Sequence, residues 1–255
     1  MDYAKVIDLV HQAKQFIASE DMRHDVHMKG AADFVTATDI AISNYLKEEL
    51  HKLYPHIGFF SEEEKGFLSD PSWILDPIDG TTNYVYGYNM SSISLALYEG
   101  GRVVFGVVYN PYSEETFTAT YGGGAFVNGR KMQTVKREMK DSIIEFGAGS
   151  TRKAEADLNF EMGKEIFKNC LDIRRICSSA LDLCFIADGR IDGYFEKVLK
   201  PWDIAAGALI LEECGGKITD YAGNFPALDK PSSVVATNGV IHDRLLGIVQ
   251  KYISI

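Results

Sequence analysis

The sequence predicts a mixed α/β fold, in which a β-rich stretch is followed by strands and helices that alternate. Two observations carry this prediction. Residues 92–127 contain short strand-like runs joined by glycine-containing turns, which is a hairpin pattern. After residue 140, runs of strand-like and helical periodicity alternate to the end of the chain, as they do in layered α/β proteins. No internal repeat or low-complexity linker divides the sequence.

The first half is expected to begin with two helices. Apolar residues recur at helical spacing within residues 1–20 and again after Thr38. The polar, glycine-containing residues 24–32 between them predict a surface loop. Strand-like runs follow at 57–60 and 72–75, and a hairpin is expected from 92–98 and 103–109. Two further strands are predicted at 115–120 and 124–127, before a turn at Asn128-Gly129.

The second half should alternate between the two kinds of element. Strands are predicted at 143–146, 173–176, 192–195 and 234–236. Helices are predicted at 154–168, 179–187 and 202–213, with a last helix at the end. We expect the two halves to be tightly joined.

Composition excludes several classes of protein. A net charge of −10 argues against a nucleic-acid surface, because such surfaces neutralise phosphates with lysine and arginine. The four cysteines form no Cys-x-x-Cys pair, so reduced thiols are favoured over a zinc or redox motif. The first residues lack a signal-peptide pattern, and no apolar run is long enough to span a bilayer. A cytoplasmic protein without a membrane partner is expected.

Residues 76–84, Asp-Pro-Ile-Asp-Gly-Thr-Thr-Asn-Tyr, are the most informative stretch of the chain. The apolar run before Asp76 predicts that both acids emerge where a strand ends. Magnesium prefers carboxylate and carbonyl oxygens and often binds substrate phosphate as well. The turn after Asp79 also exposes backbone N–H groups that suit a phosphate. Asp-Pro and Asp-Gly are ordinary turn dipeptides too, and this segment alone would favour a plain turn.

Two other acidic clusters change that balance. Glu62 and Glu63 follow the strand-like run 57–60, and Asp203 opens a helical run. Alone, the glutamates would be a solvated loop, and Asp203 would be an acid favoured by the helix dipole. Together with residues 76–84, they place acids at the ends of three elements.

These three motifs resemble the inositol monophosphatase family in sequence and order. The family pattern is Glu-Glu after a strand, then Asp-Pro-Ile-Asp-Gly-Thr-Thr-Asn, then Trp-Asp-x-Ala-Ala-Gly, and residues 36–39 and 212–216 fit it as well. The resemblance implies a layered α-β-α-β-α sandwich of the inositol monophosphatase or fructose-1,6-bisphosphatase type. It also implies one catalytic unit over 1–255, with metal motifs in 1–140 and Asp203 and substrate-side residues in 141–255. A homodimer is expected by the same resemblance.

The resemblance further implies a Mg²⁺-dependent phosphomonoesterase that is sensitive to lithium. One Mg²⁺ would be held by Glu62, Asp76 and the Ile78 carbonyl, and a second by Asp76, Asp79 and Asp203. A third, weaker ion would sit near Glu62 through waters, so two to three ions are expected.

No cysteine or histidine motif accompanies the acids, so attack by a metal-activated water is favoured over a phosphoenzyme. By resemblance, Thr81 is hydrogen-bonded to Asp39 and orients or deprotonates that water. Asp39 reads equally well as an acid in the first turn of a helix. Glu63 is expected beside the metal ligands and not on the metal.

The resemblance also assigns the substrate side. The backbone amides of Gly80 and Thr81 would receive the phosphate of a small phosphorylated substrate. The polyol would contact Asp79, Ser179, Glu196 and Asp203. Glu196 follows the strand-like run 191–195, so it is expected at a strand end near Asp203. Lys29, in the polar loop, resembles a mobile family lysine near the metal site.

One departure from the family bears on the substrate. Residues 177–179 read Cys-Ser-Ser, where inositol-preferring members tend to carry Gly-Thr-Ala. Inositol monophosphate or a similar polyol phosphate is the first hypothesis. Fructose-1,6-bisphosphatase, NADP phosphatase and 3′(2′),5′-bisphosphate nucleotidase activities stay open on the same fold. A metal-binding regulatory protein that acts through partners is the alternative of another class.

Overall fold

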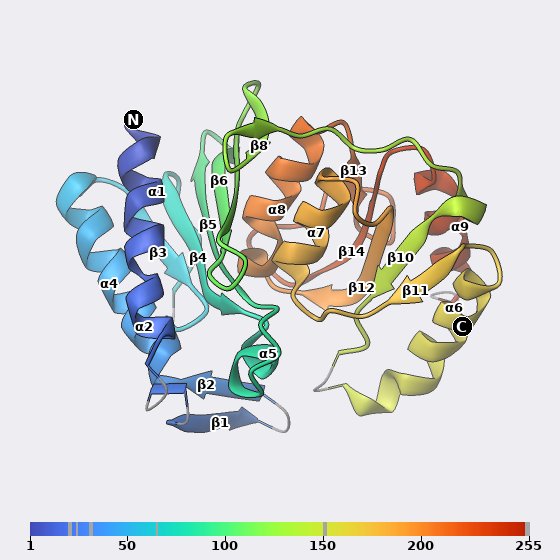
Figure 1. The fold of residues 1–255 in the computed structure, drawn as a ribbon, viewed down its shortest axis with the longest axis horizontal. Coiled ribbons are helices and arrows are strands. Elements are labelled where there is room, and N and C mark those ends of the chain that lie inside the picture. Colours follow the sequence, from blue (N-terminus) through green and yellow to red (C-terminus); the bar gives the residue numbers. More distant parts are fainter. Residues whose placement is uncertain (20–21, 24, 31–32, 65, 150–151, 253–255) are drawn as a thin grey trace.

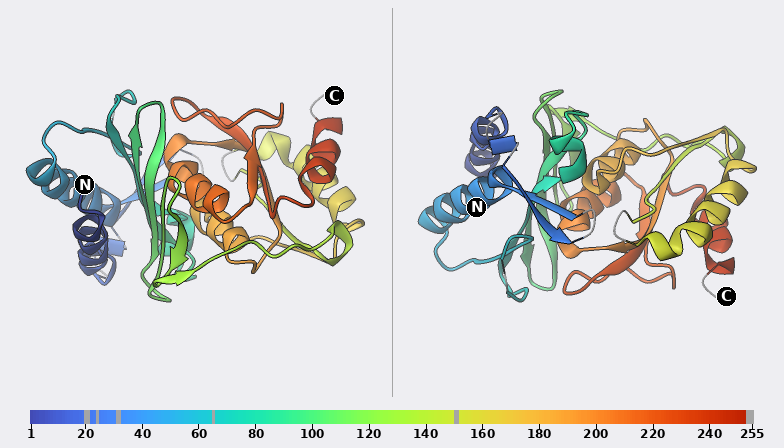
Figure 2. Two further views of the ribbon diagram at one scale, coloured as in Figure 1. Left: turned by 90° about the horizontal axis from the view of Figure 1, so that it is seen from above. Right: turned by 90° about the horizontal axis from the view of Figure 1, so that it is seen from below.

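The computed structural model describes residues 1–255 apart from 20–21, 24, 31–32, 65, 150–151 and 253–255, and apart from the side chains of 28–30 and 33. Five layers follow one another across the molecule (Figure 1). Helices cover a large sheet, two helices lie between that sheet and a smaller one, and further helices cover the far face of the smaller sheet (Figures 1 and 2). The predicted α-β-α-β-α sandwich is therefore confirmed.

The first layer consists of α1 (Tyr3–Gln12), α2 (Lys14–Ile17) and α4 (Ala37–Leu53). Their apolar faces pack on the large sheet in one buried cluster. The N-cap of α4 is Thr36, whose hydroxyl accepts from the Asp39 backbone N–H, while the Asp39 side chain accepts from the Thr36 N–H. This reciprocal capping box satisfies donors that the first turn would leave unpaired.

The surface loop predicted at 24–32 is wrong for residues 26–30, which form a strand, and residues 24 and 31–32 lie outside the described residues. Strand β1 (Val26–Gly30) pairs antiparallel with β2 (Asp33–Thr36), with an irregular register between Met28 and Gly30. The two strands form a two-stranded sheet of their own. Residues 26–29 read Val-His-Met-Lys, which alternates apolar and polar side chains over only four positions, and the flanking polar residues and glycine hid this short strand signal.

The large sheet has the order β3-β4-β5-β6-β7-β8-β9 among the described residues. Only β3 and β4 in it are parallel, and every later pair is antiparallel. The predicted hairpin and its two following strands are present. The strands are β3 (Gly58–Ser61), β4 (Ser72–Asp79), β5 (Ser92–Glu99), β6 (Arg102–Asn110), β7 (Glu115–Thr120), β8 (Gly124–Val127) and β9 (Arg130–Lys131).

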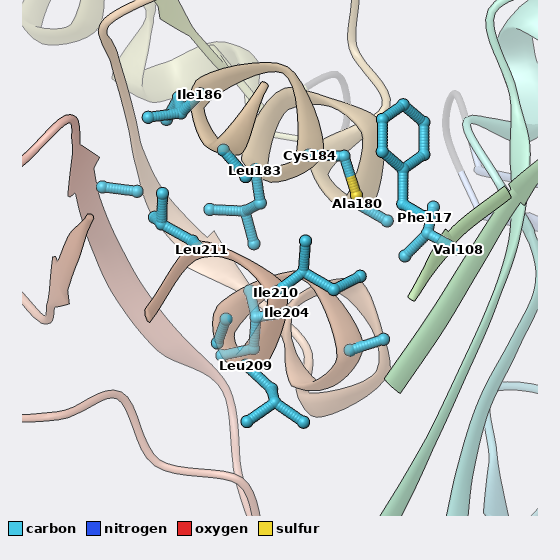
Figure 3. Close-up of a cluster of buried hydrophobic side chains, with 14 of the residues drawn as sticks. Val108, Phe117, Ala180, Leu183, Cys184, Ile186, Ile204, Leu209, Ile210 and Leu211 are labelled. Carbon is cyan, nitrogen blue, oxygen red and sulfur yellow. The ribbon is translucent and has the colours of Figure 1, made fainter. Parts of the chain in front are cut away.

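The middle layer is the helix pair α7 (Ser179–Ala187) and α8 (Pro201–Glu213), and nearly every residue in it is buried. Apolar side chains from both helices interlock with each other and with Val108 and Phe117 of the large sheet (Figure 3). Helix α8 approaches β6 so closely that a Cβ on Gly106 would lie 3.0 Å from the Ala206 carbonyl oxygen. A Cβ on Gly207 would lie 2.7 Å from the Leu183 side chain of α7. Small residues therefore set this packing distance.

The smaller sheet has the order β11-β10-β12-β14-β13. Helices α6 (Ala156–Phe167) and α9 (His242–Lys251) cover its outer face and enclose a third apolar cluster. The short strand β13 has no counterpart among the sequence predictions. The strands are β10 (Ile143–Phe146), β11 (Asp172–Arg174), β12 (Gly193–Leu199), β13 (Lys217–Thr219) and β14 (Ser232–Thr237).

The end of β4, the short helix α5 (Thr81–Val85) and the first residues of α7 and α8 all line one cavity of about 400 Å³. The fold thus brings segments from both halves of the chain to one place. Within the described part of the chain, none of the helices combines the length and the apolarity needed to cross a membrane.

Candidate functional site

Three carboxylates converge at the bottom of this cavity. Asp76 and Asp79 come from β4 and Asp203 from the first turn of α8, and one oxygen of each lies within 4.8 Å of the others. Asp76 and Asp79 are nearly inaccessible to solvent. The predicted metal ligands Asp76, Asp79 and Asp203 are therefore neighbours in space.

A bulge in β4 makes this convergence geometrically feasible. Residues three apart on a regular strand point to opposite faces of the sheet. Asp76 pairs with Ser94 and Asp79 with Ser92, so β4 contains one more residue than β5 over this stretch. The extra residue returns both carboxylates to the same side. Pro77 fits there because a bulge leaves a backbone position without a ladder hydrogen bond. The acids thus lie within the last part of β4, although the sequence placed them just after a strand.

Repulsion and burial both disfavour the ionised forms of these three carboxyl groups. Burial raises the pKa of Asp76 well above its ordinary value, and the charges of Glu62, Asp79 and Asp203 raise it further. Burial and then the Asp79 charge likewise raise the pKa of Asp203. Buried anions at this separation need a compensating cation or protons. An oxygen-only donor set with this charge fits Mg²⁺ in ligand chemistry.

Asp79 is held from the opposite side by the start of α7. Its Oδ2 accepts from the Ser178 hydroxyl and from the Ala180 backbone N–H at 3.0 Å, and its Oδ1 accepts from the Ser179 hydroxyl at 3.0 Å. Burial raises the pKa of Asp79, and these hydrogen bonds oppose that rise by favouring the charged form. The start of α7 therefore fixes the orientation of the Asp79 carboxyl group. Sequence reasoning did not assign Ser178 a role, although its departure from the family pattern marked this segment.

Glu62 lies in the turn after β3, where its backbone N–H donates to the Leu75 carbonyl at 3.2 Å. Because β3 and β4 are parallel, this turn lies beside the acids of β4. Glu62 lines the cavity and contributes to the raised pKa of both Asp76 and Asp203. Glu63 occupies the same turn and is not among the residues that line the cavity.

Thr81 makes a hydrogen bond that differs from the expected one. Its hydroxyl donates to the Ile78 carbonyl at 3.0 Å, while Asp39 Oδ2 accepts from the Thr36 hydroxyl. A hydroxyl has a single proton, so Thr81 cannot donate to Asp39 in the same arrangement. The predicted pair would require the Thr81 hydroxyl proton to point to Asp39 instead of to the Ile78 carbonyl. Gly80, just before it, has a φ of 84°, which a glycine adopts without strain.

Ser179 and Glu196, which the sequence predicted on the substrate side, line the same cavity together with Cys177 and Arg175. Glu196 lies inside β12, at an irregular register between Glu196 and Leu199, so the prediction of a strand-end position was wrong. The reason is that pairing with β14 extends the strand to Leu199.

Gly147 makes room for the Glu196 carboxylate, because a Cβ there would lie 1.9 Å from Glu196 Oε2. Burial raises the pKa of Glu196, and hydrogen bonding to Tyr194 and the Arg175 charge counteract that rise.

Arg175 is the second residue that the sequence did not single out for the site. Its Nε donates to the Phe146 carbonyl at 3.2 Å, and its guanidinium lies 5.2 Å from the centre of the Phe146 ring. These contacts hold a cation at the cavity wall. Cys177, two residues on, has a φ of 64°, which is unusual for a residue with a side chain. Lys29 belongs to β1, and its side chain lies outside the described residues.

Comparison with known proteins agrees with this geometry. The model of the inositol monophosphatase family matches residues 2–254. The chain belongs to this family. It is 38% identical over 233 residues to an inositol-1-monophosphatase of Mesorhizobium japonicum, covering 90% of this chain and 87% of that protein. It is 32% identical over 236 residues to a protein of Aquifex aeolicus named fructose-1,6-bisphosphatase/inositol-1-monophosphatase, covering 91% and 88%.

The fold agrees with a solved member as well. The crystal structure of the extragenic suppressor protein suhB from Bartonella henselae superposes with a TM-score of 0.91 at 32% identity. The alignment covers 98% of this chain and 99% of that one. The family is one of phosphatases that generally depend on Mg²⁺ and act on small phosphorylated substrates.

Proposed function

We propose that this protein is a Mg²⁺-dependent phosphomonoesterase that hydrolyses inositol monophosphate or a similar small polyol phosphate. The convergence of Asp76, Asp79 and Asp203 carries the proposal, because three carboxylates this close together, two of them buried, form a poor structural cluster and a good Mg²⁺ site. Bound Mg²⁺ would polarise the phosphoryl oxygen, lower the pKa of an attacking water and neutralise the leaving alkoxide.

We assign the ligands as the family resemblance implies. Glu62, Asp76 and the Ile78 carbonyl would hold one ion, and Asp76, Asp79 and Asp203 a second. The Ile78 carbonyl has two lone pairs, so the hydrogen bond from Thr81 does not exclude it. Glu62 is more exposed than Asp76 and Asp79 and lines the same cavity, which suits a weaker third ion held near it through waters.

The other residues bind, orient and move protons. The Gly80 and Thr81 backbone amides would receive the phosphate. Thr81, turned toward Asp39, would accept a proton from the attacking water and pass its own to that carboxylate. Ser179 and Glu196 would contact the polyol hydroxyls, since carboxylates accept hydrogen bonds from vicinal hydroxyls.

A substrate panel tests the proposal. Phosphate release would be measured with and without Mg²⁺ on inositol 1-phosphate, fructose 1,6-bisphosphate, NADP and adenosine 3′,5′-bisphosphate, with Asp203→Asn as the inactive control. The proposal expects Mg²⁺-dependent release that is fastest on the polyol monophosphate. Absence of release from every ester would favour the alternative of a metal-binding regulatory protein.

Fructose 1,6-bisphosphate is the second candidate, and Arg175 is the observation that favours it. Glu196 alone would repel a second phosphate, but Arg175 places a cation in the same half of the cavity. A guanidinium is well suited to a phosphate. Arg175→Gln should lower kcat/KM for the bisphosphate more than for inositol phosphate. Arg174→Gln is the matched control, because Arg174 is exposed and pairs with Asp172.

A further inference from the structure

Two buried acids behind the cavity have no part in the proposed chemistry. Glu145 on β10 and Asp182 on α7 are 2% and 1% exposed, and their side chains are in hydrogen-bonding contact with each other. Within the described part of the chain, neither Glu145 Oε2 nor Asp182 Oδ1 receives a hydrogen bond from any N–H or hydroxyl group. Buried carboxyl oxygens are rarely left in this state.

The groups that face this pair do not supply a compensating charge. Asp79 faces Asp182 from β4, Cys177 faces both acids from the segment before α7, and the Tyr194 hydroxyl faces Asp182 from β12. None of these three is a cation, and Tyr194 donates to Glu196, away from the pair. Arg175 is engaged by the Phe146 carbonyl and the Cys177 sulfur. Two ionised carboxylates in contact would be strongly disfavoured here.

The pair also lies where it can affect the metal site. Asp182 is in the first turn of α7, and its backbone N–H donates to the Ser178 carbonyl at 2.9 Å. The Ser178 hydroxyl in turn donates to Asp79. On the other side, Glu145 belongs to β10, which runs on to Gly147 at the cavity wall. A bond between the two acids therefore ties α7 to β10 directly behind the residues that hold Asp79.

We propose that Glu145 and Asp182 share one proton, and that this acid pair positions the start of α7 so that Ser178 and Ser179 hold Asp79. The proton makes one carboxyl a donor, which satisfies both unpaired oxygens with a single hydrogen bond. In this arrangement Glu145 and Asp182 are positioning residues. The claim that the pair positions α7 for the metal site rests on the proposed function. The claim that the two acids share a proton does not.

The direction of titration agrees with a retained proton. Burial raises the pKa of Asp182 well above its ordinary value, and contact with Glu145 raises it further. The folded protein then binds a proton that the unfolded chain has already released. Stability contributed by this group is complete below the unfolded pKa and is lost as pH rises toward the folded one.

Infrared spectroscopy tests the shared proton in the Mg²⁺-loaded protein at neutral pH. The difference between wild type and Glu145→Gln should contain the carbonyl band of a protonated carboxyl, and so should the difference for Asp182→Asn. Glu161→Gln is the control, because Glu161 is an exposed helical acid. In unfolding experiments between the unfolded and the folded pKa of Asp182, the stability of wild type should fall with pH by a slope that corresponds to about one bound proton. Glu145→Gln should remove that slope.

Calorimetric Mg²⁺ titration tests the positioning role. Glu145→Ala leaves Asp182 without its partner and should weaken Mg²⁺ binding about 10–100-fold, as loss of a group behind metal ligands usually does. Glu145→Gln should keep the wild-type affinity, because its amide donates to Asp182. Unchanged affinity in Glu145→Ala would overturn the positioning role.

If neither difference spectrum, for Glu145→Gln or for Asp182→Asn, contained the carbonyl band of a protonated carboxyl, the pair would be ionised and bridged by water. That result would overturn the shared proton. That readout also decides the proposal if Glu145→Ala does not fold. A protein with the band but without Mg²⁺ binding would instead refute the proposed function.

Discussion

Replacing Asp76 by asparagine should make the metal-free protein more stable while abolishing its activity. The amide has nearly the shape of the carboxylate, and its oxygen can still accept from the Ile78 N–H, which donates to Asp76 Oδ1 at 3.0 Å. What changes is the charge. The substitution removes one of three carboxylates whose oxygens lie within 4.8 Å of one another in a buried site.

The magnitude follows from that separation. Two unit charges 4.8 Å apart repel by about 3.5 kcal/mol at an effective dielectric constant of about 20. The raised pKa of Asp76 means that protonation relieves part of this repulsion. We therefore expect Asp76→Asn to raise the free energy of unfolding by about 2 kcal/mol without metal at neutral pH. For a chain of this size, that corresponds to an increase in Tm of about 4–8 °C.

The assay is thermal unfolding with and without Mg²⁺, combined with phosphate release. Wild type should gain about 2.7 kcal/mol at Mg²⁺ one hundred times its Kd, and the variant should gain far less. A carboxyl with a raised folded pKa loses its stabilising contribution as pH rises, so metal-free wild type should weaken with pH more steeply than the variant. Asp8→Asn, at an exposed position in α1, is the control. A variant that is less stable without metal, yet turns over normally, would refute the metal-site reasoning.

Four further outcomes are expected. Thr81→Ala should bind Mg²⁺ almost normally and turn over ~10²–10⁴-fold more slowly, the usual range for general-base assistance; lost Mg²⁺ binding would make Thr81 structural. Glu196→Gln should raise KM for inositol phosphate with little change in Mg²⁺ affinity, and wild-type kinetics on every polyol ester would remove Glu196 from the site. Lithium should inhibit by replacing a magnesium near Asp79 and Asp203, which a titration of activity checks. Burial lowers the pKa of His242 to about 4, so stability should fall as pH drops from 6.5 toward 4, and His242→Asn should flatten that dependence in unfolding experiments.

Local pattern was sufficient for much of the fold. The hairpins between residues 92 and 127 were predictable because alternating side chains and glycine turns define them within a few residues. Helix α7 begins and ends where its apolar run does. The acidic ligands were predictable because their chemistry is concentrated in short motifs.

Features that depend on distant partners were not predictable. Strand β12 continues past Glu196 because β14 pairs with it, and β4 continues to Asp79 because β5 pairs across the bulge. The hairpin of β1 and β2 depends on the pairing of two short segments, and the polar residues and glycine around the first of them indicated a loop. Arg175 and Ser178 enter the site only once the layers are assembled, so no local spacing reveals them. The sequence therefore located the acidic part of the cavity with Ser179 and Glu196, but not the contribution of Arg175 and Ser178.

The close approach of α8 to its neighbours changes the meaning of the motif that begins with Trp202. Only Asp203 in that motif faces the cavity with a ligand atom, whereas Ala206 and Gly207 face β6 and α7. The alanine and glycine of this family motif are therefore explained by the close packing of α8 against β6 and α7, and not by contact with a metal ion or a substrate. A methyl group added at Gly106 or Gly207 would touch no ligand, yet it would displace the helix that carries Asp203. Loss of activity in such a variant would reflect displacement of Asp203, although every acidic side chain of the site would still be present.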